Sequence, residues 1–354
     1  MKKQKKVMRK AKNMKRHIGI DLHTNSFTAC ILREGADAES ITLPLESGME
    51  RFLKMLQPGD EVAVESTGNS RWFRERVQEH VGRVVVVAPS QFKVIRHSVK
   101  KTDKNDARAI ATFLGAGLLP EARVKSRVQA ELATAIKLHE QGTRQRVQCI
   151  NTVHAMFNAH GIKIKKTSLG SKIGFERAVD SREWSRAEKV ALEAIAIQLD
   201  ALRKSQKLLN AEITAIAETL PGYENLISIK GIGALSAAAF LVQIGDIKDF
   251  AKAGNLAAYF GLTPRVSQSN DSQFVGRITK RGNKAIRTRL VQCALIAKKY
   301  SPYLQSFYER IRSRRGAGKA IIAVARKLLN TIFYTLAKDW VFEDFPGFEF
   351  KACN

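Results

Sequence analysis

The stretch Lys100-Lys101-Thr102-Asp103-Lys104-Asn105-Asp106-Ala107-Arg108 places two carboxylates inside a cluster of cations. On a helix, Asp103 and Asp106 are three residues apart, so they share one face and can hold one divalent cation between them. Oxygen ligands suit magnesium or manganese, while Lys100 and Lys101 attract a nucleic-acid backbone. Taken alone, the pair is more typical of an ordinary helix start with Thr102 or Asp103 as N-cap. The rest of the chain decides between these interpretations.

Upstream of this stretch, the sequence predicts an α/β layer with a mixed sheet. Three consecutive strands come first, at 17–21, 26–32 and 40–43. Helices and strands then alternate, with helices at 48–57, 71–80 and 90–98 and strands at 61–65 and 84–89. The quoted stretch begins a further helix at 103–115. Consecutive strands followed by alternation favour a mixed sheet covered by helices.

Two further acidic residues stand at the ends of predicted strands. Asp21 ends the first strand and Glu65 ends the fourth. A single strand-end Asp is usually a turn former. Functional groups of an open α/β sheet, however, gather at the carboxyl ends of its strands, and the helix at 103–115 can return across that edge. The four acidic residues together favour a two-metal site for phosphoryl transfer, formed by Asp21, Glu65, Asp103 and Asp106.

The composition indicates a polyanionic partner. Sixty Lys and Arg against 33 Asp and Glu give the 354 residues a net charge of +27 and a pI of about 10.1. A field of that sign favours nucleic acid over a membrane surface, with a ribosomal-type or merely soluble protein as the alternative. Four cysteines without a CxxC pair argue against a zinc ribbon or a disulfide framework and favour a reducing, cytosolic compartment. No apolar run is expected to reach the roughly 20 residues of a membrane span.

The chain divides into five expected segments. Residues 1–16 carry nine basic residues and no acidic one, and form a basic tail rather than a secretory signal. The α/β domain covers 17–118. Two long amphipathic helices, joined by a Ser/Gly/Lys-rich loop around 165–175, form a helical hairpin or coiled-coil arm over 119–220. The arm serves packing within the chain or, alternatively, dimerisation or gripping a nucleic acid. A mostly helical domain covers 221–345, and 346–354 form a tail.

The last domain holds three groups of candidate phosphate contacts. Paired small helices joined by Gly231-Ile232-Gly233 predict a helix-hairpin-helix, with contacts from Lys230, Gly231 and Gly233. A polar loop with three serines follows at 259–272, and its basic wall consists of Arg265, Arg277, Lys280 and Arg281. Such loops are usually only loops, but a serine beside cations can attack a phosphate. Amphipathic basic helices are expected at 284–298, 302–314 and 317–338. The basic residues of this region that contact phosphates, or alternatively form a solvated helical face, are Arg310, Arg312, Arg314, Arg315 and Lys319.

Several blocks in this order resemble the DEDD transposases, the insertion-sequence (IS110) group related to Piv-type DNA invertases. The matching blocks are Gly19-Ile20-Asp21-Leu22-His23, Val62 to Gly68, Lys101 to Ala107, Gly261 to Arg265 and Gly276 to Asn283. They cover about 17–118 and 222–300, and the arm agrees only in architecture. The resemblance implies an RNase H-like (RuvC-like) first domain and a bacterial or archaeal cytoplasmic protein acting beside the nucleoid.

The resemblance also implies an activity. Members of this family cut and rejoin DNA through a covalent serine–DNA link and are guided by a non-coding bridge RNA. They act as dimers or tetramers, in which composite sites unite residues of two subunits. By motif, Asp21, Glu65, Asp103 and Asp106 would bind magnesium, and Ser269 takes the place of the nucleophile. The family's serine is commonly followed by glycine, whereas Asn270-Asp271 follows here, and Ser267 is the alternative. Other interpretations are a Holliday-junction-type or structure-specific nuclease that uses water, and a non-enzymatic nucleic-acid-binding protein.

Overall fold

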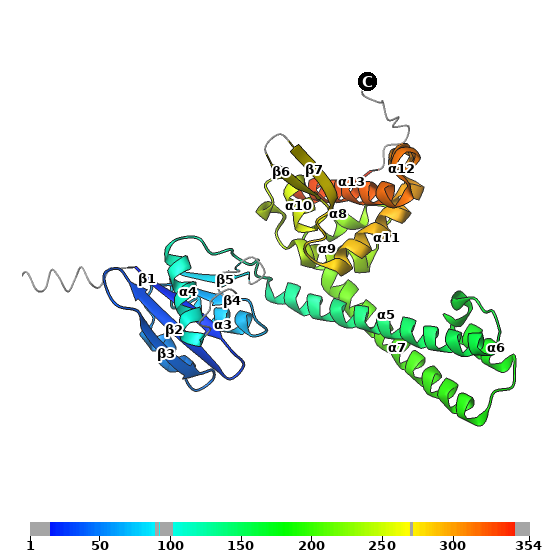
Figure 1. Cartoon of the computed structure of the whole chain (residues 1–354), viewed down its shortest axis with the longest axis horizontal. Helices are drawn as coiled ribbons and strands as arrows, with labels where there is room; N and C mark the ends of the chain where they lie inside the picture. The colour runs from blue at the N-terminus through cyan, green and yellow to red at the C-terminus, as the bar shows by residue number, and fades with distance from the viewer. Residues whose placement is uncertain (1–14, 89–91, 93–101, 270–271, 344–354) are drawn as a thin grey trace, which may run out of the picture. The chain divides into compact units, whose positions relative to one another are not determined.

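The computed structural model describes residues 15–88, 92, 102–269 and 272–343 (Figure 1). They belong to two compact units, residues 1–124 and 125–354, and each is described by itself. Most of the expected basic tail, most of the expected helix at 90–98 and the final tail lie outside the described residues, as do Lys100 and Lys101. The finer division into an arm and a last domain stays a prediction.

The first unit is built on a five-stranded mixed sheet. Its order is β3-β2-β1-β4-β5, and the strands are β1 (Arg16–Leu22), β2 (Ser26–Arg33), β3 (Glu39–Pro44), β4 (Glu61–Glu65) and β5 (Arg83–Val87). The first three strands pair antiparallel, whereas β4 pairs parallel to both β1 and β5. The predicted mixed sheet is confirmed.

The two faces of this sheet are covered by different helices. One face packs against α2 (Met49–Met55) and α3 (Ser70–Val77), burying among others Ile18, Ile20, Val62, Val64, Phe52 and Phe73. Successive strand residues point to opposite faces, so Gly19 and Asp21 of β1 point to the other face. That face is covered by α4 (Asp103–Gly115), whose Ile110 and Leu114 pack with Ala63, Val85 and Val87.

A buried ion pair fixes the amino-terminal end of β1. The Arg16 Nε donates to Asp60 Oδ1 over 2.7 Å, and the Arg16 guanidinium also donates to the Met55 carbonyl over 2.8 Å. Both Arg16 and Asp60 are buried, with exposures of 6% and 1%. Breaking one half of such a pair leaves an uncompensated buried charge. Strand β1 therefore begins at Arg16, one residue before the start expected from the sequence, and the ion pair anchors this first residue of the strand.

The second unit begins with two long helices that run side by side (Figure 1). They are α5 (Arg127–Ala159) and α7 (Arg186–Glu218), and each starts with a capping box, Ser126 with Gln129 and Ser185 with Glu188. The segment between them was expected to be a loop around 165–175, and this was wrong. It contains the short η2 (Lys166–Leu169) and α6 (Lys172–Asp180), because Leu169 and Phe175 are buried with Phe157 and Trp184.

The remainder of the second unit is mostly helical, as predicted. Its helices are α8 (Tyr223–Ile227), α9 (Ala234–Ile244), η3 (Ile247–Asp249), α10 (Ala253–Tyr259), α11 (Lys284–Tyr300), α12 (Pro302–Arg315) and α13 (Ala317–Ala337). They share one core with the base of the α5/α7 pair. A two-stranded ribbon of β6 (Pro264–Ser269) and β7 (Ser272–Ile278) joins α10 to α11.

Helix α13 corrects the expectation that no apolar run would reach the length of a membrane span. Among the described helices it is the one long and apolar enough to cross a bilayer by length and composition. Its side chains from Ala320 to Phe333 nevertheless supply much of the shared core, including the fully buried Val324 and Leu329. Its apolar character is therefore used in packing.

Candidate active site

A close approach between α4 and β1 brings the acidic residues together. A Cβ added at Gly19 would lie 2.1 Å from the Ala107 carbonyl oxygen and 2.4 Å from the Ala111 nitrogen. Only glycine lets the α4 backbone rest directly on β1 at this point. The start of α4, with Asp103 and Asp106, therefore lies over the carboxyl end of β1, where Asp21 stands two residues beyond Gly19 on the same face.

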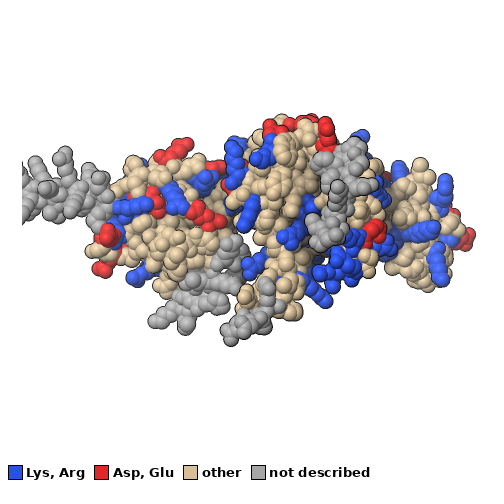
Figure 2. All heavy atoms as spheres, turned by 90° about the horizontal axis from the view of Figure 1, so that it is seen from above, with Lys and Arg blue, Asp and Glu red and all other residues tan. Residues whose placement is uncertain are grey.

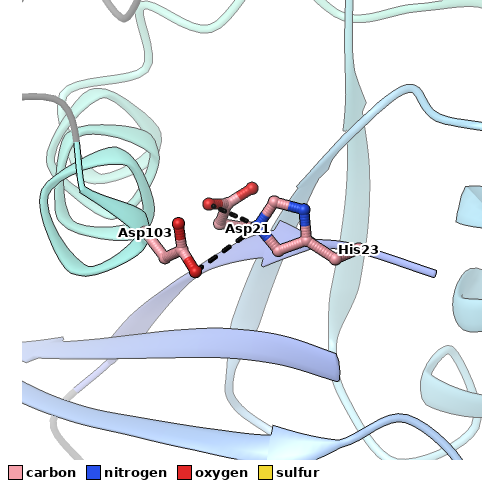
Figure 3. Close-up of side chains that lie close together, drawn as sticks. All are labelled: Asp21, His23 and Asp103. Atoms are coloured by element: carbon pink, nitrogen blue, oxygen red, sulfur yellow. Dashed lines mark ion pairs between the residues drawn. The ribbon is translucent and has the colours of Figure 1, made fainter. Parts of the chain in front are cut away.

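Three side chains at this edge form a compact cluster (Figure 3). The His23 imidazole lies between two carboxylates, with its Nε2 3.3 Å from Asp21 Oδ2 and 3.5 Å from Asp103 Oδ2. One ligand atom from each of the three lies within 4.8 Å of the others. The Asp21 side chain is largely buried, with 13% exposed, whereas the His23 and Asp103 side chains are 50% and 58% exposed. The cluster is thus open to a ligand from solvent.

The other two predicted acidic residues lie near this cluster in different ways. Asp106 is 8% exposed, and it is close enough to Asp21 to affect its ionisation. Glu65 follows Val64, which pairs with Ile20 of β1, so Glu65 and Asp21 are the next residues on neighbouring parallel strands. Both point to the α4 face by alternation. Among the described residues, the group within 4.8 Å includes neither Asp106 nor Glu65.

The electrostatics of Asp21 are those of a crowded carboxylate. Burial, the largest cause, raises the pKa of Asp21, and the nearby Asp103 and Asp106 carboxylates raise it further. His23 opposes them through its charge and its hydrogen bond, which lower the pKa. Several carboxylates gathered at one edge repel one another unless a cation lies among them. The donor set of carboxylates with one imidazole fits a divalent metal ion.

The helix-start interpretation of the 102–106 stretch holds at the same time. Thr102 is the N-cap of α4, and its hydroxyl accepts a hydrogen bond from the Asn105 backbone N–H over 3.3 Å. Asp103 and Asp106 lie in the first turn, where negative charge interacts favourably with the helix dipole. The two interpretations are therefore compatible, because the same first turn of α4 begins the helix and carries the carboxylates at the sheet edge.

His23 was not predicted as a site residue. Its backbone carbonyl accepts a hydrogen bond from Asn69 Nδ2 over 2.8 Å, and Asn69 in turn accepts one from the Thr67 hydroxyl over 2.9 Å. These bonds tie the loop after β1 to the loop after β4. The available signal was the position of His23 in the same sequence block as Asp21, two residues later. Its proximity to Asp103 depends on where α4 packs, which spacing alone does not give.

The serine-rich stretch is a ribbon and not the polar loop that was expected. Ser267 pairs with Phe274 and Ser269 with Ser272, so Ser269 ends β6 beside the hairpin tip. Ser267 is exposed, and so are the predicted cations Arg265, Arg277, Lys280 and Arg281. The prediction failed because the apolar residues Phe274 and Val275 are adjacent and both are exposed, so the ribbon lacks the period-two pattern of a half-buried strand. The serines belong to the second unit and the acidic cluster to the first.

The Gly-Ile-Gly turn joins α8 and α9 as predicted. Lys230 and Gly233 are exposed in this turn. Gly231 has a φ of +100°, and a Cβ there would lie 2.8 Å from the Cys293 carbonyl of α11. Gly231 is therefore required for packing of the turn on α11, while Lys230 and Gly233 remain accessible. The helix-hairpin-helix assignment itself stays a prediction.

The three predicted arginines of α12 lie in its last turn. Arg312, Arg314 and Arg315 are all exposed, and Arg312 forms an ion pair of 3.2 Å with Glu309. On the face drawn in Figure 2, groups of Lys and Arg side chains are more extensive than those of Asp and Glu, in keeping with the net charge of +27. Cations at the end of a helix also interact favourably with its dipole.

Two family models cover both groups of candidate residues. Residues 18–161 match the DEDD_Tnp_IS110 model, described as a transposase, and residues 223–309 match the model described as the transposase IS116/IS110/IS902 family. The chain belongs to the IS110-type transposases. It is a DNA transposase or recombinase, and the first model contains the acidic cluster while the second contains the ribbon.

Relatives of this transposase extend over nearly the whole chain. The transposase for insertion sequence element IS1111A of Coxiella burnetii is 24% identical over 94% of this chain and 93% of its own length. The transposase for element IS1328 of Yersinia enterocolitica is 24% identical over 92% of this chain and 98% of its own. The pilin gene-inverting protein of Moraxella bovis is 26% identical, with coverages of 92% and 96%.

Proposed function

We propose that this transposase is a magnesium-dependent recombinase that cuts and rejoins DNA through a covalent serine–DNA link. The observation that carries the proposal is the cluster of Asp21, His23 and Asp103, with Asp106 close by, at one sheet edge. It lies in the segment that matches the DEDD transposase model. The strand order of that segment also supports our inference that the domain is RNase H-like (RuvC-like).

The acidic residues are proposed to hold Mg²⁺, with Mn²⁺ as a substitute. Asp21, Glu65, Asp103 and Asp106 are the proposed ligands. The raised pKa of Asp21 supports this assignment, because burial and neighbouring carboxylates disfavour its ionised form unless positive charge is nearby. When bound, the ion polarises the scissile phosphate and favours ionisation of an attacking hydroxyl.

The ribbon is proposed to supply the nucleophile and the phosphate clamp. The hydroxyl of Ser269, or alternatively Ser267, loses its proton and forms a bond to the phosphorus atom. The bond from phosphorus to one sugar oxygen breaks, and that oxygen leaves as a hydroxyl after taking up a proton. The exposed cations Arg265, Arg277, Lys280 and Arg281 would stabilise the negative charge of the transition state. The same exchange in reverse rejoins a strand.

Partners are proposed on charge and on the resemblance to DEDD transposases. Double-stranded DNA would contact Lys100 and Lys101, the turn with Lys230, Gly231 and Gly233, and the arginines Arg312, Arg314 and Arg315. A non-coding bridge RNA would select the DNA sites, and a dimer or tetramer would unite the acidic edge of one subunit with the ribbon of another. The net charge of +27 supports polyanionic partners of both kinds. The place of action would be the bacterial or archaeal cytoplasm, beside the nucleoid.

A trapping experiment tests this proposal. Purified full-length protein, the RNA transcribed from the flanking element, labelled donor and target DNA and Mg²⁺ are incubated and separated on a denaturing gel. We expect a protein–DNA adduct that disappears in Ser269→Ala and in Asp106→Ala, while Ser267→Ala retains it. An adduct lost only in Ser267→Ala would move the nucleophile to that residue.

The same gel identifies the alternative activity. Cleavage that survives both serine substitutions without any adduct would mean that water is the nucleophile, as in a structure-specific nuclease. DNA binding in a gel shift without any metal-dependent cleavage would contradict both enzymatic interpretations of the acidic edge.

A further inference from the structure

The β6–β7 ribbon exposes an aromatic side chain beside its serines. Phe274 is 71% exposed. It pairs directly with Ser267 across the ribbon, and the side chains of a directly opposed pair leave the same face about 5 Å apart. A Cβ at Gly276 would come within 3.3 Å of the Phe274 ring. The absence of a side chain at Gly276 therefore leaves room for the ring on the face that also carries Ser267.

The opposite face of the ribbon is exposed as well. Val266 and Val275 pair with each other and are 56% and 58% exposed. Phe274 and Val275 are consecutive residues of β7, so their side chains point to opposite faces of the ribbon. A membrane surface needs several apolar side chains on one face, and this ribbon divides its apolar side chains between two faces. Among the described ribbon residues, Phe274 is the one large apolar side chain exposed on its face, and such a single exposed ring instead suits a flat ligand.

The charge around the ribbon identifies the class of that ligand. Between residues 250 and 308 the sequence has ten Lys and Arg and a single acidic residue, Asp271. Arg265 and Arg277 lie on the ribbon itself, and both are exposed. Aromatic rings among cations are the arrangement that binds single-stranded nucleic acid, since bases stack on the rings and phosphates contact the cations. The ribbon therefore fits a base and its neighbouring phosphate.

We propose that Phe274 stacks on an unpaired base of the DNA strand, next to the phosphate that a ribbon serine attacks. The base must be unpaired because both faces of a base inside a duplex are already covered by its neighbours. Phe274 and Ser267 are opposed on one face, so a base on the ring lies beside the Ser267 hydroxyl. This inference rests on the proposed function in one respect, namely that the neighbouring phosphate is the one that a serine attacks.

Fluorescence of a base analogue tests the stacking. The full-length protein is titrated, with EDTA present to prevent cleavage, into a DNA duplex that carries 2-aminopurine in a three-nucleotide unpaired bubble. We expect the wild type and Phe274→Tyr to quench the fluorescence and Phe274→Ala to leave it unquenched. Affinity of Phe274→Ala for the bubble should fall about 5- to 150-fold, as for the loss of one stacked base.

Val275→Ala is the matched control, because Val275 is exposed on the same ribbon but on the other face. It should keep the quenching and the affinity, and a fully paired duplex should bind Phe274→Ala within about twofold of the wild type. Equal losses in Phe274→Ala and Val275→Ala would overturn the proposal. So would an effect confined to an RNA oligonucleotide, or a fall in oligomeric mass on sedimentation of Phe274→Ala.

The outcomes separate this inference from the proposed function. Ser267→Ala and Ser269→Ala should quench like the wild type, because stacking does not need the hydroxyl. Quenching that depends on Phe274 in a protein that forms no serine adduct would support the stacking and contradict the serine mechanism. An adduct that forms with normal yield in Phe274→Ala, without any change in quenching, would support the mechanism and overturn the stacking.

Discussion

The acidic edge (Asp21, Glu65, Asp103 and Asp106) and the β6–β7 ribbon with its serines supply the two parts of the proposed chemistry, and their structural settings are opposite. The acidic edge lies where α4 touches the β1 backbone at Gly19 and where the unit's sheet is buried on both faces. The ribbon is two-stranded, and side chains on both of its faces are more than half exposed. Two-stranded ribbons are marginally stable by themselves, whereas packed interiors hold side chains in fixed positions.

This difference indicates how each half is positioned. Asp21, Asp103 and Asp106 are placed by backbone contacts within one unit, so their arrangement exists before any substrate binds. Of the described ribbon side chains, Ile278 packs against the core of its unit, whereas Val266, Phe274 and Val275 are more than half exposed. We infer that nucleic acid orders the ribbon. The predictions below test this contrast.

The largest effect is expected from Asp21→Asn. Loss of one central carboxylate should reduce strand cleavage about 1,000-fold or more, equivalent to about 4 kcal/mol. The midpoint of thermal unfolding should stay the same or rise, because burial and neighbouring carboxylates already raise the pKa of Asp21 and disfavour its charge. Asp37→Asn, at an exposed position of the same unit, serves as the control for both measurements. A lower midpoint would show that Asp21 is structural.

Gly19→Ala should damage the acidic edge without touching any acidic residue. The added Cβ would overlap the α4 backbone, so α4 must move away from β1. We expect a loss of about 1–3 kcal/mol in the free energy of unfolding, accompanied by reduced cleavage. Gly59→Ala, where a Cβ meets nothing within 4 Å, should change neither. Normal cleavage by Gly19→Ala would mean that the close approach does not position the acidic residues.

A pair of valine substitutions compares the packing of the two regions directly. Val64 in β4 is fully buried, whereas Val275 in β7 is 58% exposed. Urea unfolding should show a loss of about 2 kcal/mol for Val64→Ala and less than about 0.5 kcal/mol for Val275→Ala. Similar losses of unfolding free energy at both positions would contradict the difference in packing between the sheet and the ribbon, because the ribbon would then be part of a packed core.

The smallest effect concerns the α5/α7 arm, which belongs to neither region. Hydrogen bonds from His160 and from Ser185 lower the pKa of Glu188 from its ordinary 4.5 to about 2. The ionised Glu188 therefore stabilises the fold above pH 4.5, and this contribution is lost as the pH falls toward 2. The difference in urea midpoint between the wild type and Glu188→Gln should shrink over that window. A constant difference would show that ionisation of Glu188 is not involved.

The first unit could be predicted from sequence because its signals are local. Each strand is a short apolar or alternating run, and the strand-end positions of Asp21 and Glu65 follow from those runs. The place of His23 could not be predicted, since it depends on the packing of α4 across β1. The ribbon could not be predicted either, since its adjacent Phe274 and Val275 give no period-two pattern and Ser, Gln and Asn residues between 267 and 273 are typical of a loop.

The segment between α5 and α7 shows the same limit. Its Ser, Gly and Lys residues predict a loop, yet Leu169 and Phe175 are buried between the helix ends. That burial is a tertiary contact with Phe157 and Trp184, and local composition does not reveal it. Composition was informative for partners, because a net charge of +27 acts over the whole surface rather than through particular contacts.

Hydrogen exchange of the full-length protein, measured with and without DNA, tests most directly whether the acidic edge is fixed while the ribbon is ordered by its substrate. We predict that the amides of β1 and α4 exchange slowly in both states. The amides of 264–269 and 272–278 should exchange quickly in the free protein and slow down when DNA binds. Ribbon amides as protected as those of α4 without DNA, or unchanged by DNA, would contradict this account.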